Sequence, residues 1–84
     1  MQNLNRMMIF YQVVKLGSFT KAAQVLNVAK SAVSRHVTIL ENEVGAMLLN
    51  RTTRQLRVTK VGQIYYQGCQ RIIEETKFMQ NEVS

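Results

Sequence analysis

The sequence contains no proline and no tryptophan, a single cysteine, and only five acidic residues against eleven lysines and arginines. A lone cysteine excludes an internal disulfide framework and suits a reducing cytosol. The absence of low-complexity stretches argues against disorder. A chain of 84 residues forms one domain, or one domain with an appendage, and so small a core often depends on a partner subunit.

Long hydrophobic runs are also absent. The most apolar stretch, MMIFYQVV at residues 7–14, contains Gln12 and is followed by Lys15. It is far shorter than the ~20 residues of a membrane-spanning helix, and a core helix explains it better than a signal peptide does. We therefore expect a cytoplasmic protein with no membrane partner.

Positive charge dominates, with a formal net charge of +6 at pH 7 and a pI near 10.0. A domain this basic is a candidate for binding the phosphates of nucleic acid, because each neutralised phosphate releases a condensed counterion. A merely soluble basic surface is the alternative, and charge alone does not decide between the two. The basic residues are concentrated in the middle of the chain, at Lys15, Lys21, Lys30, Arg35, Arg51, Arg54, Arg57 and Lys60.

Apolar residues at helical spacing predict four helices, bounded by residues that commonly cap helix ends. The helices are expected at Leu4–Leu16, Thr20–Leu26, Lys30–Val44 and Lys60–Glu82. Gly17 and Gly45 are suited to end the first and third helices. Ser18 or Thr20 is suited to cap the second, and Thr59 the last.

Two short apolar segments, Met47–Leu49 and Leu56–Val58, lie between the third and last helices. They flank the polar sequence NRTTRQ, which predicts a small β-hairpin with a basic tip. The expected fold is therefore mainly α, with a two-stranded hairpin between the third helix and a long final helix.

The expected third helix has two contrasting faces. Its apolar ridge consists of Val33, Val37, Leu40 and Val44, at steps of three and four residues. Its opposite side, which we call the recognition face, consists of Lys30, Ser31, Ser34, Arg35 and Thr38. Short hydroxyl side chains let a helix come close to the floor of the DNA major groove, while Lys and Arg reach guanine or phosphate. The alternative is an ordinary polar face that only contacts solvent. The succession of a short helix with Ala22 and Ala23, a tight turn and a second helix favours the DNA-binding interpretation.

A longer pattern, F..VV..GSFTKAA..L.V..SAVSR....LE...G..LL.R....L.VT..G, runs from Phe10 to Gly62. In order and spacing it resembles the N-terminal DNA-binding domain of LysR-type transcriptional regulators. The resemblance implies a winged helix-turn-helix followed by a linker helix that pairs two copies. It also implies sequence-specific binding of double-stranded DNA by a nucleoid-associated homodimer, or a tetramer in the full-length protein, on an interrupted inverted repeat. A larger effector-binding domain is expected after Ser84.

The resemblance assigns DNA contacts to matching positions of this chain. The major groove would be read by Lys30, Ser31, Ser34 and Arg35, with Thr38 on the same face. Thr20 would contact phosphate, and Arg54 at the wing tip would enter the minor groove. Arg51 would either touch phosphate or brace the wing.

Some positions depart from the family pattern. Ala29 stands where a Ser or Thr cap is usual, so the third helix should lose a capping bond worth ~1 kcal/mol. Lys30 replaces a frequent glutamine, which shifts preference from adenine toward guanine or turns the contact into a phosphate anchor. Ser31 replaces a frequent proline, and Leu49 replaces a phenylalanine that we expect in the core.

Apolar residues continue at steps of three and four through the last helix, which predicts a surface that pairs two copies of the chain. This stripe consists of Gly62, Tyr65, Cys69, Ile72, Thr76, Met79 and Val83. Val61, Ile64 and Gly68 form a second edge that we expect to lie on the first helix. Residues 1–59 would then be the DNA-binding domain and residues 60–84 the linker and dimerisation helix. A last helix packed only on its own domain is the alternative.

His36 and Cys69 each occur alone in the sequence. A zinc site or a catalytic pair needs several partners, so we expect no metal site, no cofactor and no enzymatic activity. Cys69 should fill the stripe as a small hydrophobe, or act as a redox sensor if it forms a thiolate. The main alternative function is an interaction module that binds an acidic protein or RNA. Few aromatic residues lie near the basic segment, which argues against single-strand binding by stacking.

Overall fold

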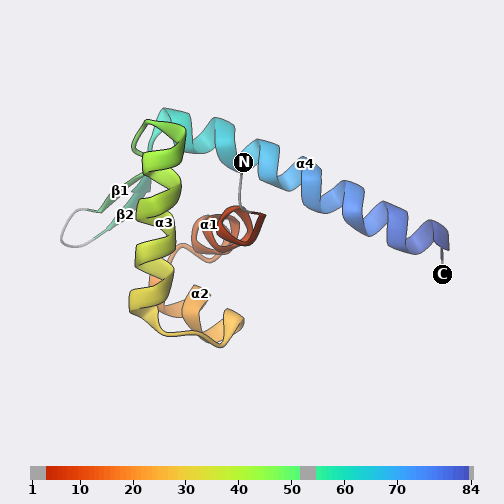
Figure 1. Ribbon diagram of the computed structural model, residues 1–84, viewed down its shortest axis with the longest axis horizontal. Helices are drawn as coiled ribbons and strands as arrows, with labels where there is room; N and C mark the ends of the chain where they lie inside the picture. Colours follow the sequence, from red (N-terminus) through yellow and green to blue (C-terminus); the bar gives the residue numbers. More distant parts are fainter. Residues whose placement is uncertain (1–3, 52–54, 84) are drawn as a thin grey trace.

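The computed structural model describes residues 4–51 and 55–83, which form a helical body and one projecting helix (Figure 1). The elements follow in the order α1 (Leu4–Leu16), α2 (Phe19–Leu26), α3 (Lys30–Val44), β1 (Leu49–Arg51), β2 (Leu56–Val58) and α4 (Lys60–Val83). The molecule measures 44 × 26 × 22 Å, and its long dimension follows α4. This order confirms the predicted winged helix-turn-helix followed by a long helix.

Local capping explains where α1 and α3 end and where α2 begins. Gly17 and Gly45 take the positive φ angles of 68° and 83° that end α1 and α3. Ser18 caps α2, since its Oγ accepts a hydrogen bond of 3.1 Å from the Lys21 N–H, and the helix begins at Phe19. Ala29 precedes α3 without a side-chain cap, as predicted.

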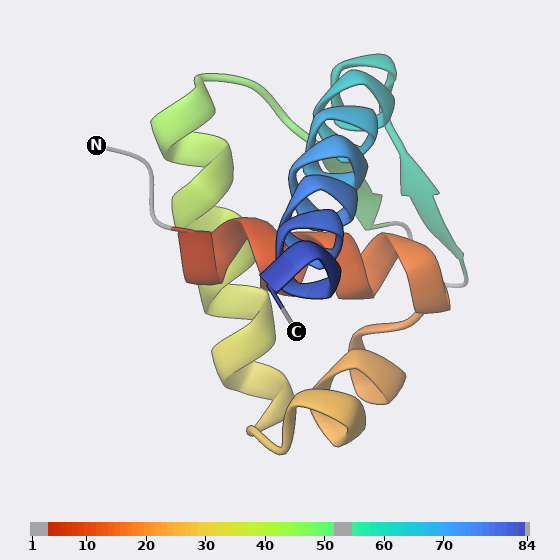
Figure 2. The same ribbon diagram turned by 90° about the vertical axis from the view of Figure 1, so that its right-hand side faces the viewer.

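The core lies where α1 crosses between α3 and α4 (Figure 2). Its centre is formed by apolar side chains from every element except β2: Phe10, Val13, Ala22, Ala23, Val33, Val37, Leu40, Leu48, Leu49 and Cys69. The alanine pair of α2 lets that short helix come close to α1 and α3, which holds the two helices of the helix-turn-helix in a fixed relation.

The hairpin pairs Leu49 with Val58, Asn50 with Arg57, and Arg51 with Leu56 in antiparallel register. The predicted bounds of the first strand, residues 47–49, were wrong. The regular strand starts at Leu49. The Leu48 carbonyl still accepts the Thr59 N–H at 3.0 Å, but the Leu48 N–H donates at 2.8 Å to a carboxylate of α3 instead of to the partner strand, and the same carboxylate accepts the Leu49 N–H at 3.1 Å. The side chain of Leu49 is buried in the core, as predicted.

Helix α4 begins against the hairpin and then leaves the body. Its first turn is fixed by Thr59, whose Oγ1 donates to the Met47 carbonyl at 2.6 Å and accepts from the Gly62 N–H at 2.9 Å. A Cβ at Gly62 would overlap with the Leu48 carbonyl oxygen, so the helix can lie this close only with glycine at that position.

The prediction of which edge of α4 meets α1 was wrong. Tyr65 packs edge-on against Phe10, with ring centroids 5.8 Å apart, and the thiol of Cys69 reaches the Met7 carbonyl at 3.9 Å. Ile64, in contrast, is 64% exposed. The reason is the position of Gly62 beneath Leu48, which turns the Tyr65 side of the helix toward α1 and the Ile64 side away.

Within the described ranges, none of the helices is both long enough and apolar enough to cross a membrane.

Candidate nucleic-acid interface

The recognition face predicted on α3 points away from the core. Lys30, Ser31, Arg35 and Thr38 are exposed and Ser34 is half-buried. On the opposite side of the same helix, Val33, Val37 and Leu40 are fully buried against α1 and α2. The helix is therefore held firmly by its apolar ridge and offers to solvent a face of cations and small hydroxyl groups.

Helix α2 lies next to this face and presents its own polar residues. Thr20 and Lys21 are exposed in its first turn, while Ala22 and Ala23 are buried behind them. The turn into α3 places Asn27 in the left-handed region, at φ 57° and ψ 47°, which a short polar side chain tolerates well. The N-termini of both helices are thereby fixed relative to the recognition face.

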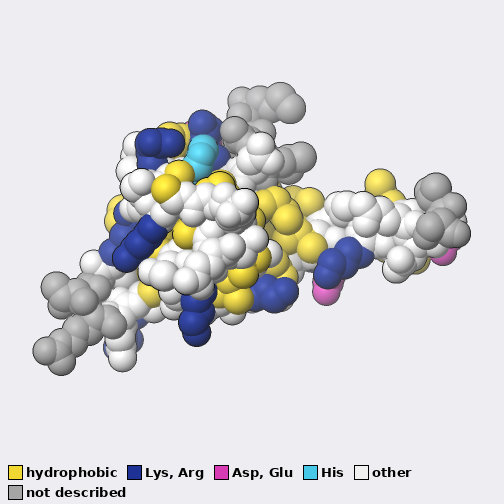
Figure 3. All heavy atoms as spheres, turned by 90° about the horizontal axis from the view of Figure 1, so that it is seen from below, with side chains coloured by type: hydrophobic (Ala, Val, Ile, Leu, Met, Phe, Trp, Pro, Cys, Tyr) yellow, Lys and Arg dark blue, Asp and Glu magenta, His cyan; other side chains and the backbone are white. Residues whose placement is uncertain are grey.

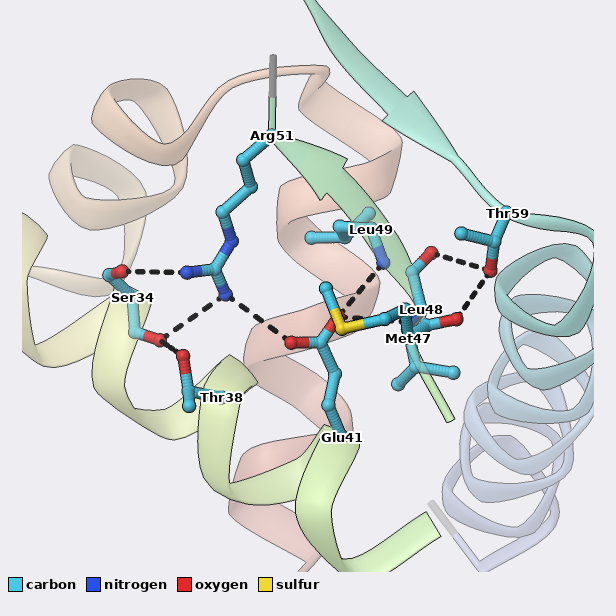
Figure 4. A network of polar contacts seen from close by, with 8 residues as sticks. All are labelled: Ser34, Thr38, Glu41, Met47, Leu48, Leu49, Arg51 and Thr59. Atoms are coloured by element: carbon cyan, nitrogen blue, oxygen red, sulfur yellow. Dashed lines mark hydrogen bonds and ion pairs between the residues drawn. The ribbon is translucent and has the colours of Figure 1, made fainter. Parts of the chain in front are cut away.

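Arg51, at the end of β1, links the hairpin to the recognition face (Figure 4). Its Nη1 donates to the Ser34 Oγ at 3.2 Å, and its Nη2 donates to the Ser34 carbonyl oxygen at 3.5 Å. Its guanidinium carbon also lies 4.9 Å from the centroid of the Phe19 ring, a cation–π arrangement with α2. Of the two roles left open for Arg51, its contacts are those of a brace.

Glu41 anchors the other end of this network and was not recognised as a structural residue from the sequence. Its Oε2 accepts the N–H groups of Leu48 and Leu49, and its Oε1 lies 3.8 Å from Arg51 Nη2. The carboxylate is buried, and the two N–H donors together with the nearby guanidinium compensate for its loss of water. A signal was present, because position 41 falls on the apolar ridge between Val37 and Val44.

The hairpin carries further positive charge beyond Arg51. Arg57 is exposed on β2 and donates to the Gln55 side chain at 3.1 Å. Arg54, expected at the wing tip, lies outside the described residues. In the view of Figure 3, Lys and Arg side chains lie mostly over the body, and the acidic side chains that can be seen lie along α4. Among the described basic residues, Lys30 and Arg35 lie on the recognition face, Lys21 lies on α2, and Arg51 and Arg57 lie on the hairpin.

The stripe predicted on α4 divides into two parts. Tyr65 and Cys69 pack against α1 of the same chain, whereas Ile72, Thr76 and Met79 are exposed. The side chain of Val83 lies outside the described part. Where the two parts meet, an apolar groove of about 290 Å³ lies between α1 and α4, lined by Met7, Met8, Cys69, Ile72, Ile73, Thr76 and Lys77.

The two lone reactive residues make no site. Burial raises the pKa of the Cys69 thiol to about 11, which keeps it protonated at neutral pH and argues against the redox-sensor alternative. The Nδ1 atom of His36 is buried without a hydrogen-bond partner among the described residues. No group of three or more potential metal ligands occurs in residues 4–51 and 55–83.

Comparison with known proteins identifies the family. The family described as "Bacterial regulatory helix-turn-helix protein, lysR family" matches residues 4–63. The chain is 47% identical over 77 residues to the HTH-type transcriptional activator AaeR of Escherichia coli K12, covering 92% of this chain and 25% of that protein. It is also 47% identical over 81 residues to the HTH-type transcriptional regulator CrgA of Neisseria meningitidis, covering 96% and 27%. The chain thus spans about a quarter of the length of these relatives.

Solved structures share the fold over nearly the whole chain. The complex of BenM_DBD with catB site 1 DNA has a TM-score of 0.90 and 33% identity, covering 98% of this chain and 92% of that chain. Full-length LysG of Corynebacterium glutamicum, with arginine bound as effector, has a TM-score of 0.89 and 26% identity, covering 98% and 28%. The relatives are transcriptional regulators, a non-enzymatic family. From the family match and these relatives together, the chain belongs to the lysR family of bacterial regulatory helix-turn-helix proteins.

Proposed function

We propose that this chain binds double-stranded DNA sequence-specifically, with α3 in the major groove. The observation that carries the proposal is the recognition face itself: small hydroxyl and cationic side chains point outward from a helix whose opposite side is buried in the core. Such a helix can approach base edges closely without losing its support. The DNA complex of BenM_DBD, a neighbour of the same fold, supports this use of the body.

The proposed contacts follow from the positions of the side chains. Lys30 and Arg35 would reach guanine or phosphate, and Ser31, Ser34 and Thr38 would approach the bases between them. Thr20 would contact a phosphate at the start of α2, and Arg54 at the wing tip would reach the minor groove. Arg51, which the network of Figure 4 already engages, would act as a brace between the hairpin and α3.

We further propose that two copies pair through residues 60–84 and bind an interrupted inverted repeat. Exposed apolar side chains of α4, namely Ile72 and Met79, continue from the apolar groove beside α1, and a water-exposed surface of this kind is stabilised by a partner. Two recognition helices joined in this way would reach successive major grooves, roughly 34 Å apart on one face of the duplex. The residues of α4 before Ile72 would serve the body, and those from Ile72 onward the partner.

Selection of bound duplexes from a random pool, at a stated salt concentration, tests the proposal. A defined motif in two inverted copies is expected, and an unselective pool would overturn it. Arg35→Ala should then relax the selected sequence, whereas Lys21→Ala on α2 should weaken all duplexes alike and lower the salt slope by about one. If neither substitution alters duplex binding, the protein is instead a module for an acidic protein or RNA.

A further inference from the structure

We propose that Arg51 is a positioning residue that makes Ser34 act as a hydrogen-bond donor to DNA, whereas Thr38, fixed by a bond within its own helix, acts as an acceptor. The proposal rests on the proposed function and goes further, because it states which kind of DNA atom each hydroxyl can meet. It follows from the contacts drawn in Figure 4.

The contact between Arg51 and Ser34 has only one polarity. A guanidinium carries N–H donors and no acceptor, so the Ser34 Oγ must be the acceptor of the 3.2 Å bond from Nη1. The hydroxyl proton of Ser34 is repelled by that cation and points away from it. Since the guanidinium covers the hairpin side of Ser34, the proton is left for a group that approaches from the open side of α3.

Thr38, one turn further along α3, has the opposite arrangement. Its Oγ1 donates to the Ser34 carbonyl oxygen at 3.1 Å, a bond that Thr side chains commonly make to the preceding turn of a helix. The proton of Thr38 is therefore directed inward, and the lone pairs of its exposed oxygen face solvent. The two hydroxyls lie about 6 Å apart along the helix axis, and they present opposite hydrogen-bonding roles to solvent.

Arg51 can impose this pattern because it is itself held from two other directions. The buried carboxylate of Glu41 lies 3.8 Å from its Nη2, and the ring of Phe19 faces its guanidinium carbon. Glu41 in turn is fixed by the two backbone N–H groups that start β1. Because these partners already restrict the arginine side chain, its contact with Ser34 costs little further rotamer entropy. An exposed arginine without such partners would pay that entropy on binding Ser34, and the contact would contribute little.

The consequence is a rule for recognition. Ser34 should require an acceptor on the DNA, which is a purine N7, guanine O6, thymine O4 or a phosphate oxygen. Thr38 should require a donor, which in the major groove is the amino group of adenine or cytosine. Ser34 should keep its role while Arg51 stays in place, and Thr38 should keep its role through its own bond to the Ser34 carbonyl.

The test compares Arg51→Met with Arg57→Met in wild-type and Ser34→Ala backgrounds. Both substitutions remove one positive charge from the hairpin, but Arg57 contacts Gln55 and not the recognition face. Single acceptors are removed from the selected duplex by a 7-deazapurine, 2-aminopurine for guanine, 5-methyl-2-pyrimidinone for thymine, or a methylphosphonate linkage. Wild-type protein and Arg57→Met should lose roughly 3- to 10-fold in affinity at one such position. Ser34→Ala and Arg51→Met should lose no affinity there.

Two further variants separate orientation from folding. Arg51→Lys keeps a donor for Ser34 and should restore sensitivity to the missing acceptor even if overall affinity is lower. Thr38→Val should relax preference at a different base position, one that Arg51→Met leaves unchanged. The inference is overturned if Arg51→Met keeps the wild-type sensitivity, or if Arg51→Lys, although folded by circular dichroism, behaves as Ser34→Ala does. A wild-type protein that selects no sequence overturns the proposed function as well.

Discussion

The body and the projecting half of α4 are built in contrasting ways. In the body, apolar side chains from α1, α2, α3 and β1 are buried together, and polar groups such as the Glu41 carboxylate have partners. Beyond Ile73, the described side chains of α4 are all exposed, including Phe78 and Met79. A solitary helix of that length is marginal in water. The body is therefore stabilised within one chain, whereas the second half of α4 has no packing within the described part of the chain and would gain it in the proposed dimer.

The same substitution in the two regions should give the largest contrast. Phe10→Ala should lower the free energy of unfolding by about 3–5 kcal/mol, because the ring is fully buried and its removal leaves a cavity. Phe78→Ala, at a side chain 59% exposed, should change it by less than about 0.5 kcal/mol. Denaturant unfolding at low protein concentration measures both. Equal losses would show that the tip of α4 is buried within the chain's own fold.

Pairing through α4 should be disrupted by Ile72→Asp without damage to the body. A charge in the apolar groove should lower affinity for a duplex with two half-sites by roughly 100-fold, since the second half-site is no longer bound intramolecularly. Affinity for a single half-site should change little. Gln67→Asp adds the same charge at an exposed position off the stripe and serves as the control in titrations. Equal losses on both duplexes for Ile72→Asp would count against the dimer.

Two glutamates of α3 test whether buried polar contacts hold the hairpin to the body. Glu41→Gln should cost about 2 kcal/mol of unfolding free energy, because the buried charge that accepts two backbone N–H groups is removed. Glu43→Gln should cost at most about 0.5 kcal/mol, since its ion pair with Arg6 lies at the surface. Thermal or denaturant unfolding of both variants measures the difference. If Glu41→Gln lowers the free energy of unfolding no more than Glu43→Gln does, the anchoring role of Glu41 is refuted.

Cys69 lies at the boundary between the two regions, and its burial should make the stability of the folded chain depend on pH. Its pKa rises from an ordinary 9.0 to about 11 in the folded chain, because burial disfavours the thiolate. The thiol therefore ionises first in the unfolded chain. The contribution of Cys69 to the free energy of unfolding should be constant below pH 9 and fall between pH 9 and 11, by on the order of 1 kcal/mol. Cys69→Ala should flatten this part of the profile. The pKa values of Tyr65 and Tyr66 are also raised, first by burial and in part by Cys69, and the decline that they add above pH 10 should be retained in part by the variant.

The smallest effect concerns the start of α3, which has no side-chain cap. Ala29→Ser should stabilise the body by about 0.5–1 kcal/mol, because residue 29 already has the extended backbone of a cap, at φ −69° and ψ 145°. Ser18→Ala, which removes the existing cap of α2, should destabilise it by a similar amount. Melting temperatures compare the pair, and a destabilising Ala29→Ser would show that the hydroxyl finds no N–H partner.

Helices and their ends were predictable because their signals are local. Gly17, Ser18 and Gly45 define helix boundaries through their own backbone and side-chain preferences, and the ridge of α3 could be identified from residue spacing. The start of β1 was not predictable, since it depends on the Glu41 carboxylate, which lies seven residues before Leu48 and accepts the Leu48 N–H that would otherwise face the partner strand.

The candidate site was predictable in its residues but not in its contacts. The spacing of Lys30, Ser34 and Arg35 placed them on one face of α3, where the structure also has them. The link from Arg51 to Ser34 joins residues seventeen positions apart. The edge of α4 that meets α1 depends on how closely Gly62 approaches Leu48, which helical periodicity alone does not contain.

The close approach of Gly62 to Leu48 sets the direction in which α4 leaves the body. The helix has 24 residues and is about 36 Å long. Its first turn can lie against the Leu48 carbonyl because Gly62 has no Cβ atom. A tilt of about 10° at this base would move the far end by roughly 6 Å for a rod of that length. In the proposed dimer, one added methyl group at Gly62 would therefore alter the distance between the two recognition faces, and with it the spacing of the half-sites that they can bind.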